Sequence, residues 1–211
     1  MNTQTHLLIS AFLLTKPGQS GRNIAAIAGA LAPDASIYAL VIWSKINQIP
    51  ESQVWNGYYW QQPWQLYGAI FNSVPFYLLG LLLSLVFLNY SKSRPSVVSL
   101  AEPPPMNSKL WLWACVFFAS CLLHITFDFP VHVEDAHRHF WPLSDWRFQS
   151  PISYWNSAHH GDLVQIIEFL GAVIMLSVLF MRFQALWVRS LLVIAGLAYV
   201  IMPFYWAWQF S

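Results

Sequence analysis

Long apolar stretches constrain this chain more than any other feature of its sequence. Five of them approach 20 residues, the length that an α-helix needs to cross the hydrocarbon core of a bilayer, and they lie near residues 23–43, 66–89, 110–128, 163–181 and 186–208. Charged residues make up only 9% of the chain, against roughly 25% in an ordinary soluble domain. The sequence therefore predicts an all-α, polytopic membrane protein with about five full transmembrane helices.

A shorter apolar segment precedes the first of these spans. It covers His6–Leu14 and is followed by a turn that contains Pro17 and Gly18. This segment is too short to cross a bilayer, so we expect a short N-terminal helix or re-entrant segment that folds back against the next helix. A secretory signal peptide is disfavoured, because residues 1–5 contain no basic residue and no small-residue cleavage pattern follows.

The whole chain, residues 1–211, is expected to form a single membrane domain. Its N-terminal helices occupy residues 1–90 and its C-terminal helices residues 109–211, which include a histidine-rich loop over 129–162. The intervening residues 91–108 contain several prolines and no apolar periodicity, which is typical of an extended linker.

The basic residues predict how the helices are oriented. If the five spans alternate in direction, most lysines and arginines fall on one side, which the positive-inside rule makes cytoplasmic. These residues are Lys16, Arg22, Lys92, Arg94, Lys109, Arg182 and Arg189. The chain is thus expected to cross its membrane several times, with the 91–108 linker in the cytoplasm and the 129–162 loop outside, which in a bacterium is the periplasmic face.

Histidines and carboxylates are concentrated in one part of the chain. Six of the seven histidines and six of the nine acidic residues lie between Leu123 and Glu168. Imidazoles and carboxylates are ligands of divalent metal ions and the usual proton-transfer groups of hydrolases. Any chemistry that the protein performs is therefore expected in this region.

Helical rise places several ionisable side chains at one depth in the membrane. His124 lies about 15 residues and Asp34 about 12 residues from the inner end of its span, or roughly 22 and 18 Å. Asp128 lies one turn above His124 on the same helix face, and His6 reaches a similar depth if its segment folds back. Glu168 lies just over a turn inside the outer end of its own span. A carboxylate inside a bilayer costs about 2.5 to 3.5 kcal/mol on insertion scales, so all of these groups are expected to face the bundle interior and share a partner.

A divalent metal ion would satisfy all of these groups at once, since it neutralises carboxylates and binds neutral imidazoles. We therefore predict a metal site, with zinc as the first expectation, formed by His6, Asp34, His124 and Asp128. Glu168 and His160 are the predicted catalytic residues, as general base or outer partner. Further candidate ligands are His132, His137, His139 and His159.

Each of these residues also has a plainer interpretation. His124 and Asp128 could form only a hydrogen-bonded pair on their helix. Asp34 could cap a helix that restarts after Pro33, and His6 could lie at the membrane interface. The histidines of the 129–162 loop could belong to a wet polar loop, or cap the helix that follows it.

Four short motifs resemble those of a known family. The segments MNTQTHLLIS, GALAPDAS and LLHITFDFP, with a downstream WPLS, are similar to the LexA-regulated, inner-membrane metal-dependent hydrolase family. The resemblance covers most of residues 1–145 and implies a small bacterial helical membrane protein with a divalent-metal hydrolytic centre. It implies that His6, Asp34, His124 and Asp128 occupy positions of the family motifs.

The second full span departs from this family pattern. The family has a His-Arg-Gly and a Thr-His-Ser triplet there, whereas this chain reads YGAIFNS over residues 67–73. Asn72 stands where the family has a histidine, and the arginine is absent. The chain therefore resembles a divergent branch, in which histidines of the 132–160 region could replace the missing ligands.

Together these features favour a membrane-embedded, metal-dependent hydrolase that acts on a lipid or lipid-linked ester or phosphoester. The sequence contains no glycine-rich phosphate loop and no GxSxG motif, and its net charge of +1 without a basic stripe disfavours nucleic acid as a partner. Metal or proton transport is the alternative, and it predicts acidic or histidine steps that continue toward the cytoplasm. A third possibility is a noncatalytic membrane scaffold whose polar loop docks a partner.

Overall fold

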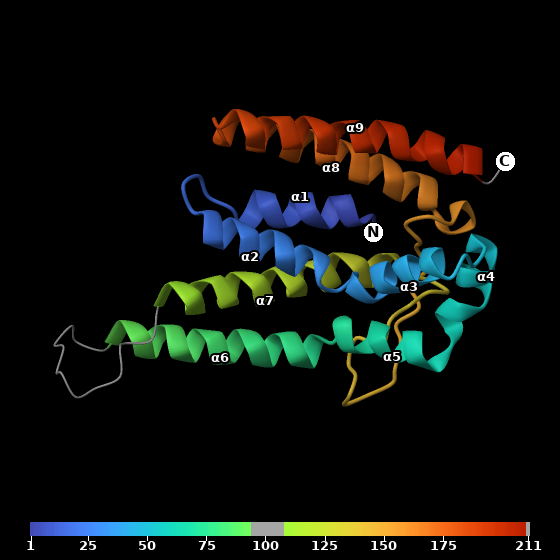
Figure 1. Ribbon diagram of the computed structural model, residues 1–211, viewed down its shortest axis with the longest axis horizontal. Helices are drawn as coiled ribbons and strands as arrows, with labels where there is room; N and C mark the ends of the chain where they lie inside the picture. The colour runs from blue at the N-terminus through green and yellow to red at the C-terminus, as the bar shows by residue number, and fades with distance from the viewer. Residues whose placement is uncertain (94–107, 210–211) are drawn as a thin grey trace.

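The computed structural model describes residues 1–93 and 108–209, with side chains as far as residue 201, so most of the predicted 91–108 linker lies outside the described residues. The described chain is helical and contains no β-strand, and its long helices run side by side along one axis (Figure 1). The helices are α1 (Thr3–Leu14), α2 (Ser20–Leu31), α3 (Ala35–Ile46), α4 (Glu51–Asn56), α5 (Gln62–Phe71), α6 (Val74–Ser93), α7 (Ser108–Asp128), α8 (Gly161–Arg182) and α9 (Leu186–Gln209). Single 3₁₀ turns occur at Tyr58–Trp60, Phe129–Val131 and Ser157–His159.

Three helical segments are long and apolar enough to cross a membrane among the residues that the structure describes. They are Gln62–Ser93, Ser108–Val131 and Gly161–Arg182, and the bent pair α2 and α3 is a fourth candidate. The described part of α9, Leu186–Ile201, is a shorter apolar helix, as is α1. The structure thus supports three to four spans, and the predicted count of about five is not confirmed.

The predicted single helix over residues 23–43 is divided by a bend of 68° between α2 and α3. Pro33 lies in this bend, where its ring and its missing N–H prevent a continuous helix. The carbonyl oxygen of Pro33 accepts a hydrogen bond from Asn72 Nδ2 at 3.1 Å. Asn72 itself lies at the break between α5 and α6, so a side chain from one interrupted helix pairs with a backbone carbonyl freed at the bend of the other.

Helix α7 packs against α1, α2 and α6, while α1 lies antiparallel to α2 and also contacts α8 (Figure 1). The α2–α7 approach is close because small residues meet there. Ala26 and Ala30 are fully buried, and a Cβ atom at Gly29 would lie 2.3 Å from the carbonyl oxygen of Phe117. Ser120 of α7 donates a hydrogen bond to the Ala26 carbonyl at 2.6 Å. This contact fixes the depth of α2 relative to α7.

The two ends of the helix bundle are formed by different turns and loops (Figure 1). At the end with the α1–α2 and α8–α9 turns, Arg22 and Arg182 donate hydrogen bonds to the carbonyls of Leu14 and Phe12, at 2.6 and 2.7 Å. At the opposite end lie α4 and the long loop between α7 and α8. There Arg147 donates to the Ala136 carbonyl within the loop. The assignment of the first end to the cytoplasm stays a prediction.

Candidate metal centre

His6, His124 and Asp128 converge where α1 meets α7. His124 and Asp128 are one helical turn apart, and their side chains meet with His124 Nε2 3.1 Å from Asp128 Oδ2. His6 Nε2 of α1 lies 2.9 Å from Asp128 Oδ1, and the two imidazole rings stack with centroids 3.6 Å apart. One ligand atom from each residue lies within 4.8 Å of the others, and all three residues are buried. This group could hold a metal ion.

Asp34 joins this cluster from the bend between α2 and α3. Its Oδ1 atom lies 3.5 Å from His124 Nε2, and its Oδ2 atom accepts a hydrogen bond from the Thr3 hydroxyl at 2.5 Å. Asp34 stands at the N-cap position of α3, but its side chain makes no capping hydrogen bond. The bend therefore directs the carboxylate toward His124, and the plainer interpretation of Asp34 as a helix cap is not what the structure shows.

The hydrogen bonds of His124 define which of its ring nitrogens can bind a cation. Its Nδ1 atom lies 2.7 Å from the carbonyl oxygen of Ala30, which can only accept, so Nδ1 carries the hydrogen. In a neutral ring the Nε2 atom then carries a lone pair and can only accept. It faces the carboxylates of Asp34 and Asp128, which are also acceptors. A proton or a metal ion must lie between such groups. Histidine ligands of metals commonly donate their other N–H to a backbone carbonyl in this way.

The stacked rings make simultaneous protonation of the two histidines unfavourable. Two imidazolium rings 3.6 Å apart would repel each other strongly in a buried site. His6 Nδ1 is also buried without a hydrogen-bond partner among the described residues. Two neutral imidazoles and two carboxylates form a donor set that a divalent ion neutralises. The residues present therefore fit a divalent metal.

Glu168 of α8, a predicted catalytic residue, contacts the start of α1 instead of the histidines. Its carboxylate accepts hydrogen bonds from Asn2 Nδ2 at 2.9 Å and from the Thr5 hydroxyl at 2.7 Å. The Thr5 hydroxyl also lies 2.7 Å from the Tyr199 hydroxyl. Glu168 thus anchors the turn that carries His6. His160, the other predicted catalytic residue, is exposed at the N-cap of α8 with φ 62°.

The loop between α7 and α8 reaches the cluster through His132. Its Nε2 atom lies 3.3 Å from Asp128 Oδ1, and its Nδ1 atom lies 3.0 Å from Asp135 Oδ2. The ring of His137 lies 5.2 Å from that of His132, and the ring of His139 lies 5.7 Å from that of His137. These three histidines are buried, so the interpretation of this stretch as a wet polar loop is wrong for them.

His139 and His159, which are also predicted ligands, contact groups outside the cluster. His139 Nδ1 donates to the Asn72 carbonyl at 3.2 Å, which ties the loop to the break between α5 and α6. His159 is half-buried, with its Nε2 atom 3.9 Å from Glu134 Oε1. The structure therefore brings His132 to the centre but gives His139 and His159 other contacts.

Burial and neighbouring charges shift the pKa values of the loop histidines in opposite directions. Burial alone would lower the pKa of His132, but the Asp128 carboxylate overcomes this effect and raises it. Burial, together with the nearby His132 and His139, lowers the pKa of His137 to about 3. His137 is therefore a neutral imidazole at physiological pH, able both to donate and to accept a hydrogen bond.

We expect acid to destabilise the folded loop through His137. Its pKa is about 3 when folded and 6.5 in the reference state, so below about pH 6.5 the unfolded chain binds a proton that the folded chain does not. Stability then falls with decreasing pH, by up to about 1.4 kcal/mol per pH unit. A His137→Gln variant lacks this contribution, and its unfolding free energy should fall less between about pH 7 and about pH 5.

The groups that face His137 are present in both proteins, so the comparison isolates its contribution. They are His132, His139, Asp135 and Arg138. The measurement is reversible unfolding in detergent at the two pH values. Equal losses of stability in the wild type and in His137→Gln would contradict the assignment of a buried neutral ring.

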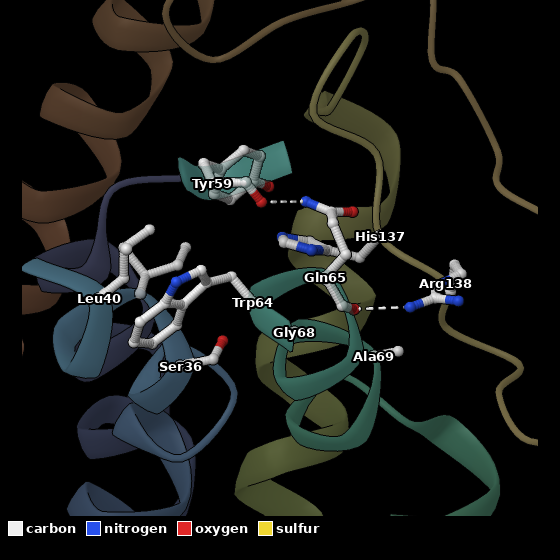
Figure 2. A pocket seen from close by; sticks show the side chains of 10 residues that line it. Ser36, Leu40, Tyr59, Trp64, Gln65, Gly68, Ala69, His137 and Arg138 are labelled. Carbon is white, nitrogen blue, oxygen red and sulfur yellow. Dashed lines mark hydrogen bonds between the residues drawn. The ribbon is translucent and has the colours of Figure 1, made fainter. Parts of the chain in front are cut away.

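A small cavity of about 10 Å³ lies between α3, α5 and the 137–138 segment of the loop (Figure 2). Its walls include Ser36, Ile37, Leu40, Tyr59, Trp64, Gln65, Gly68, Ala69, His137 and Arg138. Figure 2 shows the two hydrogen bonds that hold the loop side: Gln65 Nε2 donates to the Tyr59 carbonyl, and Arg138 Nη2 donates to the Gln65 carbonyl, both at 2.8 Å. The cavity lies on the loop side of the metal centre, since the His137 ring lies 5.2 Å from the His132 ring, and His132 Nε2 lies 3.3 Å from Asp128 Oδ1.

Sequence reasoning missed the groups that orient the ligands, namely the Thr3 hydroxyl, the Ala30 carbonyl and Gly29. A sequence does not show which backbone carbonyl will accept a hydrogen bond from a ligand. The small residues of α2 are a usable signal, because Ala26 and Ala30 lie four apart and indicate a face on which another helix can approach closely.

Comparisons of this chain with protein-family models, with curated proteins and with solved structures found no match. The resemblance to the metal-dependent hydrolase family stays a prediction from the sequence motifs.

Proposed function

We propose that this protein is a membrane-embedded, metal-dependent hydrolase whose divalent ion, zinc in the first instance, is bound by His6, Asp34, His124 and Asp128. The orientation of His124 carries this proposal. Its Nδ1–H is used on the Ala30 carbonyl, and its Nε2 atom faces two carboxylates, so a proton or a cation must lie between them. Such an arrangement suits a cation that accepts electron pairs from all three groups.

A divalent ion bound there would polarise a substrate oxygen and lower the pKa of a bound water toward neutrality. The chain's own groups supply the geometry. Asp128 contacts both stacked rings, while Thr3 fixes Asp34 from α1. His132 presents a further nitrogen from the loop side, and Asp135 orients its ring. Because the site is buried, these electrostatic interactions are stronger than they would be in water.

The surroundings of the centre favour a lipid-like substrate. The outward faces of the candidate spans expose large apolar side chains, including Leu79, Leu82 and Val86 of α6 and Ile166, Ile167 and Ile174 of α8. A substrate that reaches a centre between such helices is expected to partition into the bilayer first. We propose a lipid or lipid-linked ester or phosphoester, cleaved in a bacterial inner membrane on the periplasmic side.

Transport of metal ions or protons ranks second, because the bundle has few polar side chains between the centre and the end of the bundle that carries Arg22 and Arg182. Ser120 donates a hydrogen bond to the Ala26 carbonyl, and its oxygen lies 2.8 Å from the Ser10 hydroxyl, which can donate to it. The polar groups on the basic side of the cluster are therefore already paired. The described parts of the helices between these serines and the basic end contain no histidine or acidic residue. A relay would need such groups.

We expect zinc-loaded protein in lipid vesicles to hydrolyse a lipid ester or phosphoester, and a chelator to abolish the reaction. His124→Ala should lower the rate at least ~100-fold, since loss of even an outer partner of a metal site costs about 10- to 100-fold. His159→Ala is the matched control, because His159 lies at the loop edge against Glu134. Hydrolysis that survives the chelator would contradict the proposal, and metal-dependent ion flux without hydrolysis would favour transport.

A further inference from the structure

Two buried polar side chains face the small cavity beside the centre (Figure 2). Ser36 is 5% exposed and His137 is 8% exposed. In the part of the chain that the structure describes, no hydrogen bond joins the Ser36 hydroxyl or the His137 ring to another residue, and their polar atoms keep some accessible surface. Buried polar groups of this kind are usually paired, either with protein or with ordered water.

Gly68 of α5 provides the space between these two side chains. A Cβ atom at Gly68 would lie 3.9 Å from Ser36 Oγ and 4.0 Å from His137 Nδ1, with no other atom within 4 Å. The cavity volume of about 10 Å³ is close to that of one water molecule. The position therefore offers one water a hydroxyl on one side and an imidazole on the other.

The cavity is linked to the metal centre through its His137 side. Ser36 lies in the first turn of α3, which begins directly after Asp34. The His137 ring lies 5.2 Å from the His132 ring, and His132 Nε2 lies 3.3 Å from Asp128 Oδ1. On this side, a water held in the cavity is separated from Asp128 by the side chains of His137 and His132.

We propose that this cavity is a water site that supplies the metal centre from the loop side. The inference rests on the proposed function and adds the route by which the hydrolytic water arrives. Ser36 and His137 hold the water by hydrogen bonds, and Tyr59, Trp64 and Leu40 complete the wall around it. Water reaches the buried ligands through this position and not through the apolar faces of the helices.

Gly68→Ala tests this route because the added methyl group occupies the proposed water position at ordinary contact distances. Alanine is also the better helix former, so folding should be preserved. Gly171→Ala on α8 is the matched control, since its Cβ atom would meet only Met175 Cε, at 3.9 Å. Ser36→Val places a methyl group in the same space from α3 and serves if Gly68→Ala does not fold.

The probe is Mn²⁺ bound to the purified protein, measured by its stoichiometry and by the relaxation rate of the bulk water protons that exchange with it. We expect unchanged Mn²⁺ content in all variants, and at least a twofold smaller relaxation enhancement in Gly68→Ala than in the wild type or Gly171→Ala. Unchanged relaxation in Gly68→Ala, or no enhancement in Mn²⁺-loaded wild type, would overturn the water route and leave the metal site standing. Wild-type protein that binds no metal would overturn the proposed function as well.

Discussion

Replacing Asp128 with asparagine is expected to lower the affinity for a divalent ion at least ~100-fold and to destabilise the metal-free fold. The substitution keeps the size of the side chain and removes only its charge. Asp128 contacts His6, His124 and His132, and it also accepts a hydrogen bond from the Met1 nitrogen. No other described carboxylate contacts so many groups of the centre.

The cost to the fold follows from what the substitution leaves behind. Removing one partner from a buried charged network costs about 3 to 5 kcal/mol, because the remaining groups stay buried without compensation. Affinity is measured by competition with a chelator, and stability by unfolding with and without metal. Asp145→Asn is the matched control, since Asp145 is an exposed loop carboxylate that pairs with Arg138. An Asp128→Asn variant with wild-type affinity would contradict the assignment of Asp128 as a ligand.

Gly29→Ala is expected to separate α2 from α7 and to weaken metal binding at the same time. The new Cβ atom would lie 2.3 Å from the Phe117 carbonyl oxygen and 2.7 Å from Ser120 Cβ, and a backbone atom cannot move aside as a side chain can. Forcing extra volume into a packed core costs about 1 to 3 kcal/mol. The displaced helix carries the Ala30 carbonyl away from His124 Nδ1, so the ligand loses its orientation.

The measurement pairs the free energy of unfolding with metal affinity, with Gly171→Ala again as the control. That variant should be neutral or slightly stabilising, because its Cβ atom meets a flexible methionine end at an ordinary distance. If Gly29→Ala binds metal as the wild type does, the close approach of α2 and α7 does not govern the geometry of the centre.

The convergence of the predicted ligands could be anticipated from the sequence because helical rise is fixed. The i, i+4 spacing places His124 and Asp128 on one face, and counting from the basic end places Asp34 at the same level. In the structure His124 and Asp128 lie against His6, on a helix that folds back as expected, and Asp34 reaches His124. Depth in the membrane did not, however, distinguish a metal ligand from a structural residue. Glu168 lies near the same level, but its carboxylate accepts hydrogen bonds from Asn2 and Thr5 at the start of α1.

The bend at Pro33 could not be derived from local patterns. A proline followed by aspartate is compatible with a helix cap, a kink or a broken span, and the choice depends on Asn72, 39 residues away, which pairs with the freed carbonyl. The burial of the loop histidines could not be derived from local patterns either. The alternation of polar residues suggested that these histidines point to different sides. Tertiary contacts, such as the hydrogen bond from Ser150 N to the His132 carbonyl at 2.9 Å, instead hold the irregular backbone so that His132, His137 and His139 are all buried.

The most direct test is the metal content of detergent-purified protein, measured by elemental mass spectrometry for the wild type and for a His124→Ala, Asp128→Ala double variant. The arrangement of ligands predicts about one divalent ion per chain in the wild type, with zinc foremost, and its loss in the double variant. A wild-type protein that contains no metal after growth in metal-supplemented medium would contradict the assignment of this cluster as a metal centre.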